Sequence, residues 1–109
     1  MKPPERGEVW LVDLGLAAKV RPSVVLSVAP TDLERALVTL VPHTTSLRGT
    51  RFEASTQVRF LKPGSFDAQS IVTVPFVRLM RRLGRLSSTE LGTVEDAVVR
   101  WLGLSRRGA

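Results

Sequence analysis

Short apolar segments alternate with proline, glycine and hydroxyl-containing residues over the first three quarters of the chain. Segments of this kind predict strands, and the residues between them predict turns. The predicted strands span residues 8–14, 21–28, 36–41, 51–58 and 70–74. Strand 8–14 is apolar on both faces, so we expect both faces to be buried. Pro42 is expected to end the third strand, because proline cannot donate to a sheet, and residues 43–50 then form a polar loop.

The spacing of the apolar residues changes near residue 87. Ser87, with Glu90 three residues later, forms a capping box. Apolar residues then recur at spacings of three and four, which predicts one face of an amphipathic helix, at Leu91, Val94, Val98 and Trp101. Gly103 supplies the stop signal. Before the helix, leucines and a methionine alternate with Arg78, Arg81, Arg82 and Arg85. This stretch predicts a short helical turn with solvated arginines, and a role in nucleic-acid binding is the alternative.

Several short strands followed by one helix predict a mostly β fold, a small barrel or sandwich. A chain of 109 residues forms a single domain, here 1–109. No apolar run approaches the roughly 20 residues that a membrane span needs. The N-terminal segment contains Pro3 and Pro4 and no apolar signal core, so the expected location is cytoplasmic.

The charge of the chain is strongly positive, at +6, and 13 of its 16 cations are arginine. Arginine suits planar anions such as phosphate, so we expect a polyanionic partner, either nucleic acid or an acidic protein segment. An arginine-rich composition imposed by a high-GC genome is the alternative. Cysteine is absent, which excludes disulfides, thiolate catalysis and cysteine-bound zinc. One histidine and scattered acidic residues offer no metal-binding cluster, so neither a metal nor another cofactor is expected.

Arg21 is the first candidate for a functional residue. It precedes Pro22 at the start of a predicted strand, and proline restricts the residue before it to extended geometry. A guanidinium fixed in this way can present its donors to a phosphate with little further ordering. The alternative is a solvated strand end.

A series of short motifs follows in order along the chain: Arg6–Trp10 with Asp13, Arg21-Pro22 with Val24–Ser27, Val41–Thr45, Phe52-Glu53, and Arg82–Ser87. As an ordered set, they resemble the MazF/PemK (Kid-like) family of toxins from type II toxin–antitoxin systems. The resemblance implies an SH3-like β-barrel with a C-terminal amphipathic helix, working as a homodimer. It also implies a metal-independent endoribonuclease (an mRNA interferase) that cuts single-stranded RNA at short sequences. The cognate antitoxin would lay an acidic, disordered tail across the RNA groove.

The resemblance assigns the family's catalytic arginine to Arg21 and its catalytic threonine to Thr44. The chain departs from the family's pattern in two places. Loop 15–20 is shorter than in many relatives and lacks their acidic residue. The family's Asp-Gln pair corresponds either to Asp67 with Gln69 or to Gln69 with Ser70.

RNA carries its own nucleophile, the 2′-hydroxyl, so a ribonuclease needs neither a metal nor a covalent side chain. Arg21 suits stabilisation of the phosphorane, and Thr44 can orient the same phosphate. The expected products are a 2′,3′-cyclic phosphate, or the 3′-phosphate formed when it opens, and a 5′-hydroxyl. His43 adjoins Thr44 and titrates near neutrality. It either assists proton transfer or stacks on a base, or it is a loop or core histidine.

Further residues around these two are expected to hold the RNA: Lys19, Thr45, Ser46, Arg48 and Arg51. Each is also explained as ordinary surface. Trp10 and Trp101 are interpreted as core or dimer-interface residues rather than stacking platforms. Two other functions remain open: a non-catalytic toxin on the same scaffold that inhibits gyrase, or an inactive relative that only binds antitoxin. The presence of both Arg21 and Thr44 favours the nuclease, provided that the two lie in one exposed groove.

Overall fold

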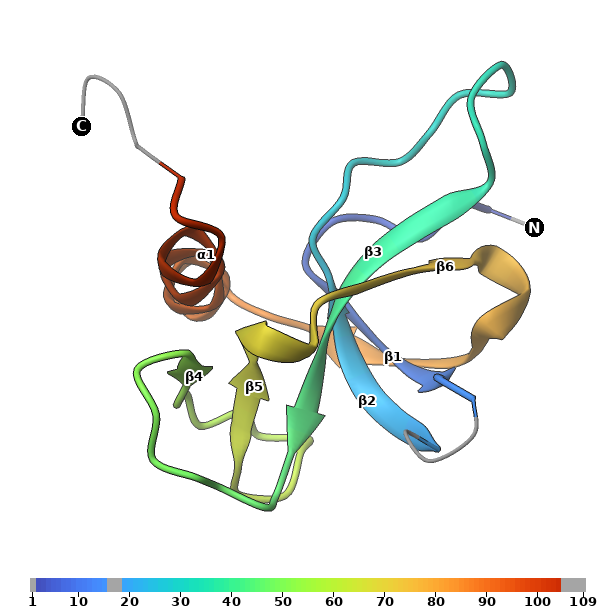
Figure 1. Cartoon of the computed structure of the whole chain (residues 1–109). Helices are drawn as coiled ribbons and strands as arrows, with labels where there is room; N and C mark the ends of the chain where they lie inside the picture. The colour runs from blue at the N-terminus through green and yellow to red at the C-terminus, as the bar shows by residue number, and fades with distance from the viewer. Residues whose placement is uncertain (1, 16–18, 105–109) are drawn as a thin grey trace.

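A computed structural model describes residues 2–15 and 19–104. The middle of the loop predicted at 15–20 therefore lies outside the described residues. The strands are β1 (Glu8–Asp13), β2 (Val20–Val25), β3 (Leu37–Thr44), β4 (Glu53–Ala54), β5 (Ser65–Asp67), β6 (Val72–Pro75) and β7 (Leu79–Arg85). Two 3₁₀ turns, η2 (Ala68–Ser70) and η3 (Phe76–Arg78), flank β6, and the helix α1 (Ser88–Leu102) follows β7 (Figure 1).

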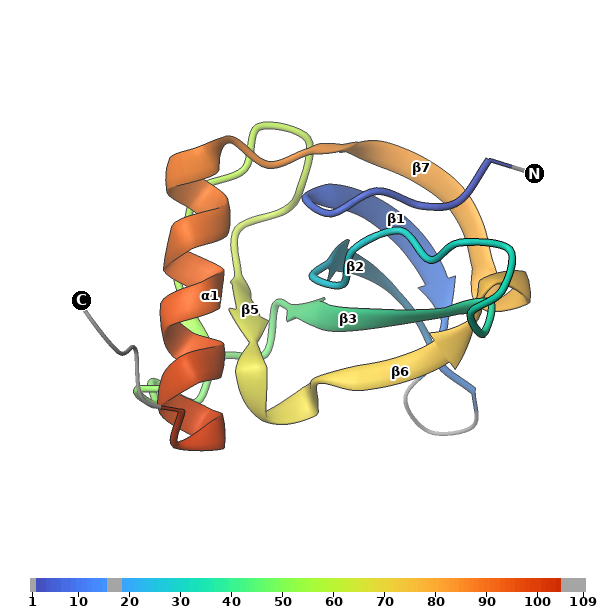
Figure 2. The same cartoon turned by 90° about the horizontal axis from the view of Figure 1, so that it is seen from above.

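The described strands form one antiparallel sheet in the order β4-β5-β3-β2-β1-β7, and β6 pairs with the first half of β3. The sheet curls so that β6 and β7 lie on opposite sides of β3, with η3 between them (Figure 2). The predicted mostly β fold with a C-terminal helix is confirmed. The sheet is not closed, however, because β6 and β7 do not pair within the described residues. "Barrel" is therefore a loose description of this sheet.

Two hydrophobic cores lie on the two faces of this curled sheet. One packs beneath α1 and includes Val9, Phe66 and Val94, and the other fills the inside of the curl and includes Val12 and Leu40. Strand β1 contributes to both, since Val9 and Val12 are each fully buried. The prediction that both faces of this strand are buried is confirmed.

Helix α1 begins and ends where the sequence predicts. The Ser87 hydroxyl accepts from the N–H of Glu90 (3.1 Å), and the Glu90 carboxylate accepts from the N–H of Ser87 (2.7 Å). Gly103 ends the helix with φ +67°, a left-handed conformation that suits glycine. Val94 and Val98 are buried, whereas Trp101 at the C-terminal end is 40% exposed and lies edge-on to Phe52. No helix in the described ranges is long and apolar enough to cross a membrane.

The prediction that Pro42 ends the third strand is wrong. Strand β3 continues through Pro42 to Thr44. Residues 37–40 pair with β6, whereas His43 and Thr44 pair with β5. Pro42 lies after the residues paired with β6 and before those paired with β5, so its missing N–H removes no hydrogen bond to either strand. Thr44 consequently sits on a strand rather than in a polar loop.

The predicted strand 51–58 is mostly absent. Only Glu53 and Ala54 form a strand, paired with the unpredicted strand β5. Val58 and Leu61 then join the first core from an irregular segment, where the N–H of Leu61 donates to the carbonyl of Val58. The chain thus leaves the β4–β5 ladder after Ala54 and turns at 58–61 instead of continuing as a strand.

From Leu79 onward the arginine-rich stretch before the helix is a strand, β7, where the sequence predicted a helical turn, whereas Arg78 ends the 3₁₀ turn η3. Strand β7 pairs with β1, but Leu83 and Met80 are skipped in the register. These two irregularities, bulge-like in character, hide the period of two that would have identified a strand.

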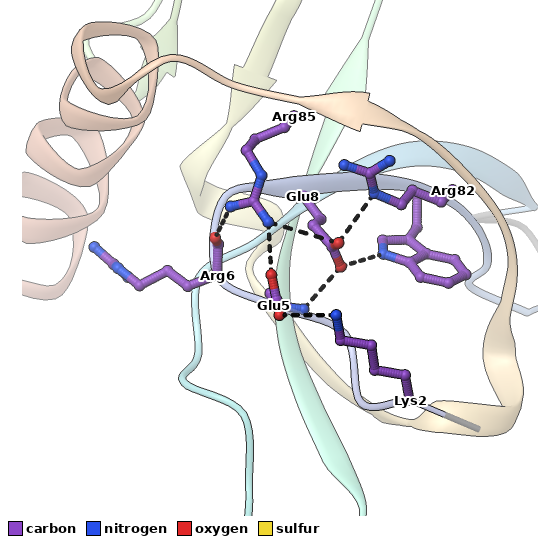
Figure 3. Close-up of polar contacts among 7 residues, drawn as sticks. Lys2, Glu5, Arg6, Glu8, Arg82 and Arg85 are labelled. Atoms are coloured by element: carbon purple, nitrogen blue, oxygen red, sulfur yellow. Dashed lines mark hydrogen bonds and ion pairs between the residues drawn. The ribbon is translucent and has the colours of Figure 1, made fainter.

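Three of the four arginines named in this stretch are paired rather than simply solvated: Arg78 contacts Asp13 (3.8 Å), and Arg82 and Arg85 contact acidic residues near the N-terminus (Figure 3). Arg82 contacts the Glu8 carboxylate through its Nε (3.0 Å), and Arg85 contacts Glu5 (2.7 Å). Glu8 also accepts from the N–H of Glu5 and from the indole N–H of Trp10. The N-terminal motif thus fastens the first residues of the chain to β7.

Candidate active site

The strand register brings Arg21 and Thr44 to the same face of the sheet. The pairing of β2 with β3 ends at Ser23 opposite Pro42. Past this point β3 pairs with β5, and Arg21 lies opposite Val12 of β1. Arg21 lies two residues before Ser23, and Thr44 lies two residues after Pro42, so both are two positions beyond this last residue pair. Since side chains alternate along a strand, both share the face of Ser23 and Pro42.

A cavity of about 390 Å³ opens at the diverging ends of β2 and β3. It is lined by Leu14, Arg21, Pro42, His43, Thr44, Ser46, Arg48, Glu53, Asp67, Ser70 and Val72. Arg21 is half-buried at its edge. A second hollow of about 480 Å³ is formed by residues 55–64 and includes none of the predicted site residues. The cavity between the strand ends is therefore the candidate active site.

Thr44 is oriented by the loop that follows it. Its hydroxyl oxygen accepts a hydrogen bond from the N–H of Ser46 (3.0 Å). A threonine hydroxyl that accepts in this way can still donate its own hydrogen, for example to a phosphate oxygen. The turn-stabilising role and the phosphate-binding role are thus compatible in one side chain.

Gly64 allows the preceding loop to approach Thr44 closely. A Cβ atom at Gly64 would lie 2.2 Å from the carbonyl oxygen of Thr44 and 2.7 Å from Cε1 of His43. The carbonyl oxygen belongs to the backbone, so it can make room for a Cβ only if Thr44 itself moves.

We expect Gly64→Ala to lower the free energy of unfolding by about 2 kcal/mol, because the added methyl overpacks a backbone contact. The displacement of Thr44 should also slow RNA cleavage. Urea unfolding monitored by circular dichroism measures the first effect. Gly92→Ala is the matched control, because nothing lies within 4 Å of a Cβ there and alanine favours the helix. Equal stability of the Gly64→Ala and parent proteins would contradict the expectation.

His43 borders the cavity but is only 5% exposed. It follows Pro42 on the strand, so its ring points to the opposite face from the Thr44 side chain. There it lies edge-on to Phe66, with ring centroids 5.1 Å apart. Burial lowers the pKa of His43 below its ordinary 6.5, which leaves the ring neutral at pH 7. This placement fits a histidine turned into the core, and the proton-transfer role stays a prediction.

We expect His43→Gln to change the cleavage rate by no more than about twofold between pH 6 and 8, because the buried ring packs against Phe66 on the opposite face of the strand from the Thr44 side chain. Initial cleavage rates measured across this range check it. An inflection present in the parent protein and lost in the variant would instead support proton transfer by His43.

The other predicted RNA-binding residues divide into two groups. Ser46 and Arg48 line the cavity with Arg21 and Thr44. Lys19, Thr45 and Arg51 are exposed but do not line it, and the Arg51 guanidinium lies 4.6 Å from the centre of the Phe52 ring. Within the ranges that the structure describes, no group of three or more histidine, cysteine or acidic side chains is arranged to hold a metal ion.

Three polar residues that sequence reasoning did not place in the site also line the cavity: Glu53, Asp67 and Ser70. Glu53 lies opposite Asp67 in the short β4–β5 ladder. Both acids stand in motifs noted from the sequence, but only the pairing of β4 with β5 brings them to the cavity. Of the two suggested positions for the Asp-Gln pair, the cavity includes Asp67 and Ser70 but not Gln69.

Comparison with known proteins identifies the family of the chain. A family model described as a PemK-like, MazF-like toxin of type II toxin–antitoxin systems matches residues 5–102. The chain belongs to this family. A MazF-like relative, endoribonuclease MazF9 of Mycobacterium tuberculosis, is 31% identical over 107 residues, covering 85% of this chain and 91% of its own.

Solved structures of MazF-like proteins have the same fold. An endoribonuclease in complex with its cognate antitoxin, from a mycobacterial species, superposes with a TM-score of 0.80 at 25% identity, covering 94% of this chain and 97% of its own. A MazE–MazF complex from Deinococcus radiodurans gives a TM-score of 0.79 at 21% identity, covering 96% of this chain and all of its own. The latter likeness concerns the fold alone. The family resemblance inferred from the motifs is thus confirmed.

Proposed function

We propose that this MazF-like toxin is a metal-independent, sequence-specific endoribonuclease that cleaves single-stranded RNA at the cavity between β2 and β3. The observation that carries the proposal is that Arg21 and Thr44, assigned separately from two motifs, line the same cavity. A protein that only binds a partner has no need of this pair in one groove. Both side chains stand on strand ends, which hold them in place before the substrate arrives.

In the proposed reaction, the 2′-hydroxyl of the RNA loses its proton and attacks the adjacent phosphorus, while the 5′-oxygen of the next nucleotide leaves and takes up a proton, so that no net proton is released. The products are a 2′,3′-cyclic phosphate, which can open to a 3′-phosphate, and a 5′-hydroxyl. Arg21 stabilises the charge that develops on the phosphorane, because preorganised charge is often the largest catalytic contribution. A guanidinium offers donors and no acceptor, so Arg21 is assigned no proton transfer. The Thr44 hydroxyl donates to the phosphate and orients it.

The proposed partners follow from the family and from the charge of the chain. The protein acts as a homodimer in the cytoplasm and is neutralised by an antitoxin with an acidic, disordered tail. A net charge of +6 favours both RNA and such a tail through long-range attraction. Relatives support the antitoxin partner, since solved MazF structures include complexes with it.

The test is digestion of a long RNA in EDTA, followed by analysis of the product ends. Cuts at one short motif that leave cyclic phosphates and 5′-hydroxyls would support the proposal. Absence of cleavage, together with inhibition of DNA supercoiling by gyrase, would replace it with the non-catalytic toxin. Absence of both, with retained antitoxin binding, would indicate an inactive relative.

A further inference from the structure

One carboxylate gathers the backbone of the loop between β3 and β4. Glu53 accepts hydrogen bonds from three successive backbone N–H groups, those of Arg48 (2.9 Å), Gly49 (2.8 Å) and Thr50 (3.2 Å). Consecutive N–H groups that converge in this way form an anion-binding concavity. Gly49 has φ +70°, a left-handed conformation that allows the chain to curl around the carboxylate.

Few other contacts hold this loop: Arg100 donates to the carbonyl of Arg51 (3.0 Å), and the N–H groups of Phe52 and Glu53 donate to the hydroxyl and the carbonyl of Thr50. Every residue from 45 to 51 is exposed, so the loop gains almost nothing from apolar burial. At its first end, the N–H of Ser46 donates to the Thr44 hydroxyl. At its other end, the three hydrogen bonds to Glu53 close it. Ser46 and Arg48, which the loop carries, line the cavity beside Arg21 and Thr44.

We propose that Glu53 is a positioning residue that folds the 45–50 loop into the shape in which Ser46 and Arg48 face the bound RNA. This inference rests on the proposed function. A loop that is already ordered binds its ligand without a further loss of conformational entropy, so Glu53 contributes to RNA affinity although its own charge has the sign of the phosphates. Hydrogen bonds from the backbone, that of Arg48 foremost, lower the pKa of Glu53 below its ordinary 4.5, so the carboxylate keeps its charge at neutral pH.

The alternative role of Glu53 makes the opposite prediction. A carboxylate that merely added negative charge to the cavity would repel RNA, and its removal would then strengthen binding. A positioning carboxylate that is removed leaves three N–H groups facing solvent and frees the loop, so binding weakens. The sign of the change in affinity therefore separates the two roles.

The experiment compares Glu53→Ala and Glu53→Gln in the full chain. Binding is measured with a short RNA that contains the site mapped in the EDTA digestion and carries a 2′-O-methyl group at the cleaved position. We expect Glu53→Ala to weaken binding by about 3- to 10-fold and to raise KM by the same factor, with kcat nearly unchanged. Glu53→Gln keeps an acceptor oxygen and should retain most of the affinity. Glu34→Ala is the matched control, because Glu34 also accepts from a loop N–H, that of Thr31, but does not line the cavity.

The conformation of the loop can also be measured without RNA, by nuclear magnetic resonance of its backbone amides. The amide proton of Gly49 should shift as Glu53 titrates, with a midpoint below 4.5, and this titration should vanish in Glu53→Gln. Unchanged or tighter RNA binding by Glu53→Ala would overturn the inference, as would a Gly49 amide that does not respond to pH. If the parent protein itself neither binds nor cuts RNA, the proposed function fails instead. If it cuts RNA and Glu53→Ala does so with the same KM, only this inference fails.

Discussion

Arg21→Ala is expected to slow RNA cleavage by about 10²- to 10³-fold, the typical cost of removing one preorganised group that stabilises the transition state. The guanidinium is the one cation that the β2 strand itself brings to the cavity, and no neighbouring strand residue replaces it. Arg21→Lys should recover only part of the rate, because an ammonium lacks the planar fork that grips two phosphate oxygens. Single-turnover rates on a short RNA that contains the mapped site measure both effects.

The control for this prediction is Arg35→Ala, in the exposed loop before β3. It removes the same charge at an exposed residue that does not line the cavity and should leave the rate within about twofold, since exposed charges contribute little individually. An Arg21→Ala protein that cleaves within tenfold of the parent rate would refute the catalytic role of this arginine. Comparable circular dichroism spectra of the two variants would exclude unfolding as the cause.

The second prediction concerns stability: Glu8→Ala is expected to lower the free energy of unfolding by about 2–3 kcal/mol. The Glu8 side chain is only 11% exposed. Its removal leaves the N–H of Glu5 and the indole N–H of Trp10 without their acceptor and releases Arg82. For a domain of this size, the melting temperature should fall by roughly 10 °C or more. Asp32→Ala, at an exposed loop position, should change stability by less than about 0.5 kcal/mol.

The contribution of Glu8 should also depend on pH. Burial by itself raises the pKa of this carboxyl, but the hydrogen bonds from Glu5 and Trp10 and the charge of Arg82 outweigh it, so the pKa lies below the ordinary 4.5. A lowered pKa in the folded state stabilises the protein above the unfolded-state pKa, and this stabilisation is lost as the pH falls through the folded-state value. The stability difference between the parent and Glu8→Gln should therefore be largest above about pH 5 and shrink below pH 4.5. A difference that stays constant down to pH 3 would show that the Glu8 charge contributes nothing.

Local signals in the sequence predicted those elements whose boundaries are set by neighbouring residues. The capping box at Ser87 and the left-handed Gly103 set the two ends of α1, and each signal lies next to the end that it sets. Elements whose form depends on a distant partner were not predictable in this way. Strand β3 passes through Pro42 because its partner changes from β6 to β5, and no residue near Pro42 signals that change.

The residues of the candidate site likewise divide into those that a local motif identifies and those that only the folded chain brings to the cavity. Arg21 and Thr44 stand in motifs with a recognisable local pattern, and the register then carries both to one face. Glu53 enters the cavity only because β4 pairs with β5 and because its carboxylate collects three N–H groups of the preceding loop. A sequence motif marks such a residue, but the folded chain is needed to assign it a contact.

Strand β7 has a consequence for how copies of the protein behave toward one another. It forms one end of the sheet, and such an edge offers backbone N–H and C=O groups to any strand of another molecule. The two register shifts between β7 and β1 interrupt the regular spacing of backbone groups that an incoming strand would need. The exposed Arg81 and Arg82 add like charges that two such edges would have to bring together. We therefore expect this irregular, arginine-bearing edge to disfavour the addition of a strand from a second molecule.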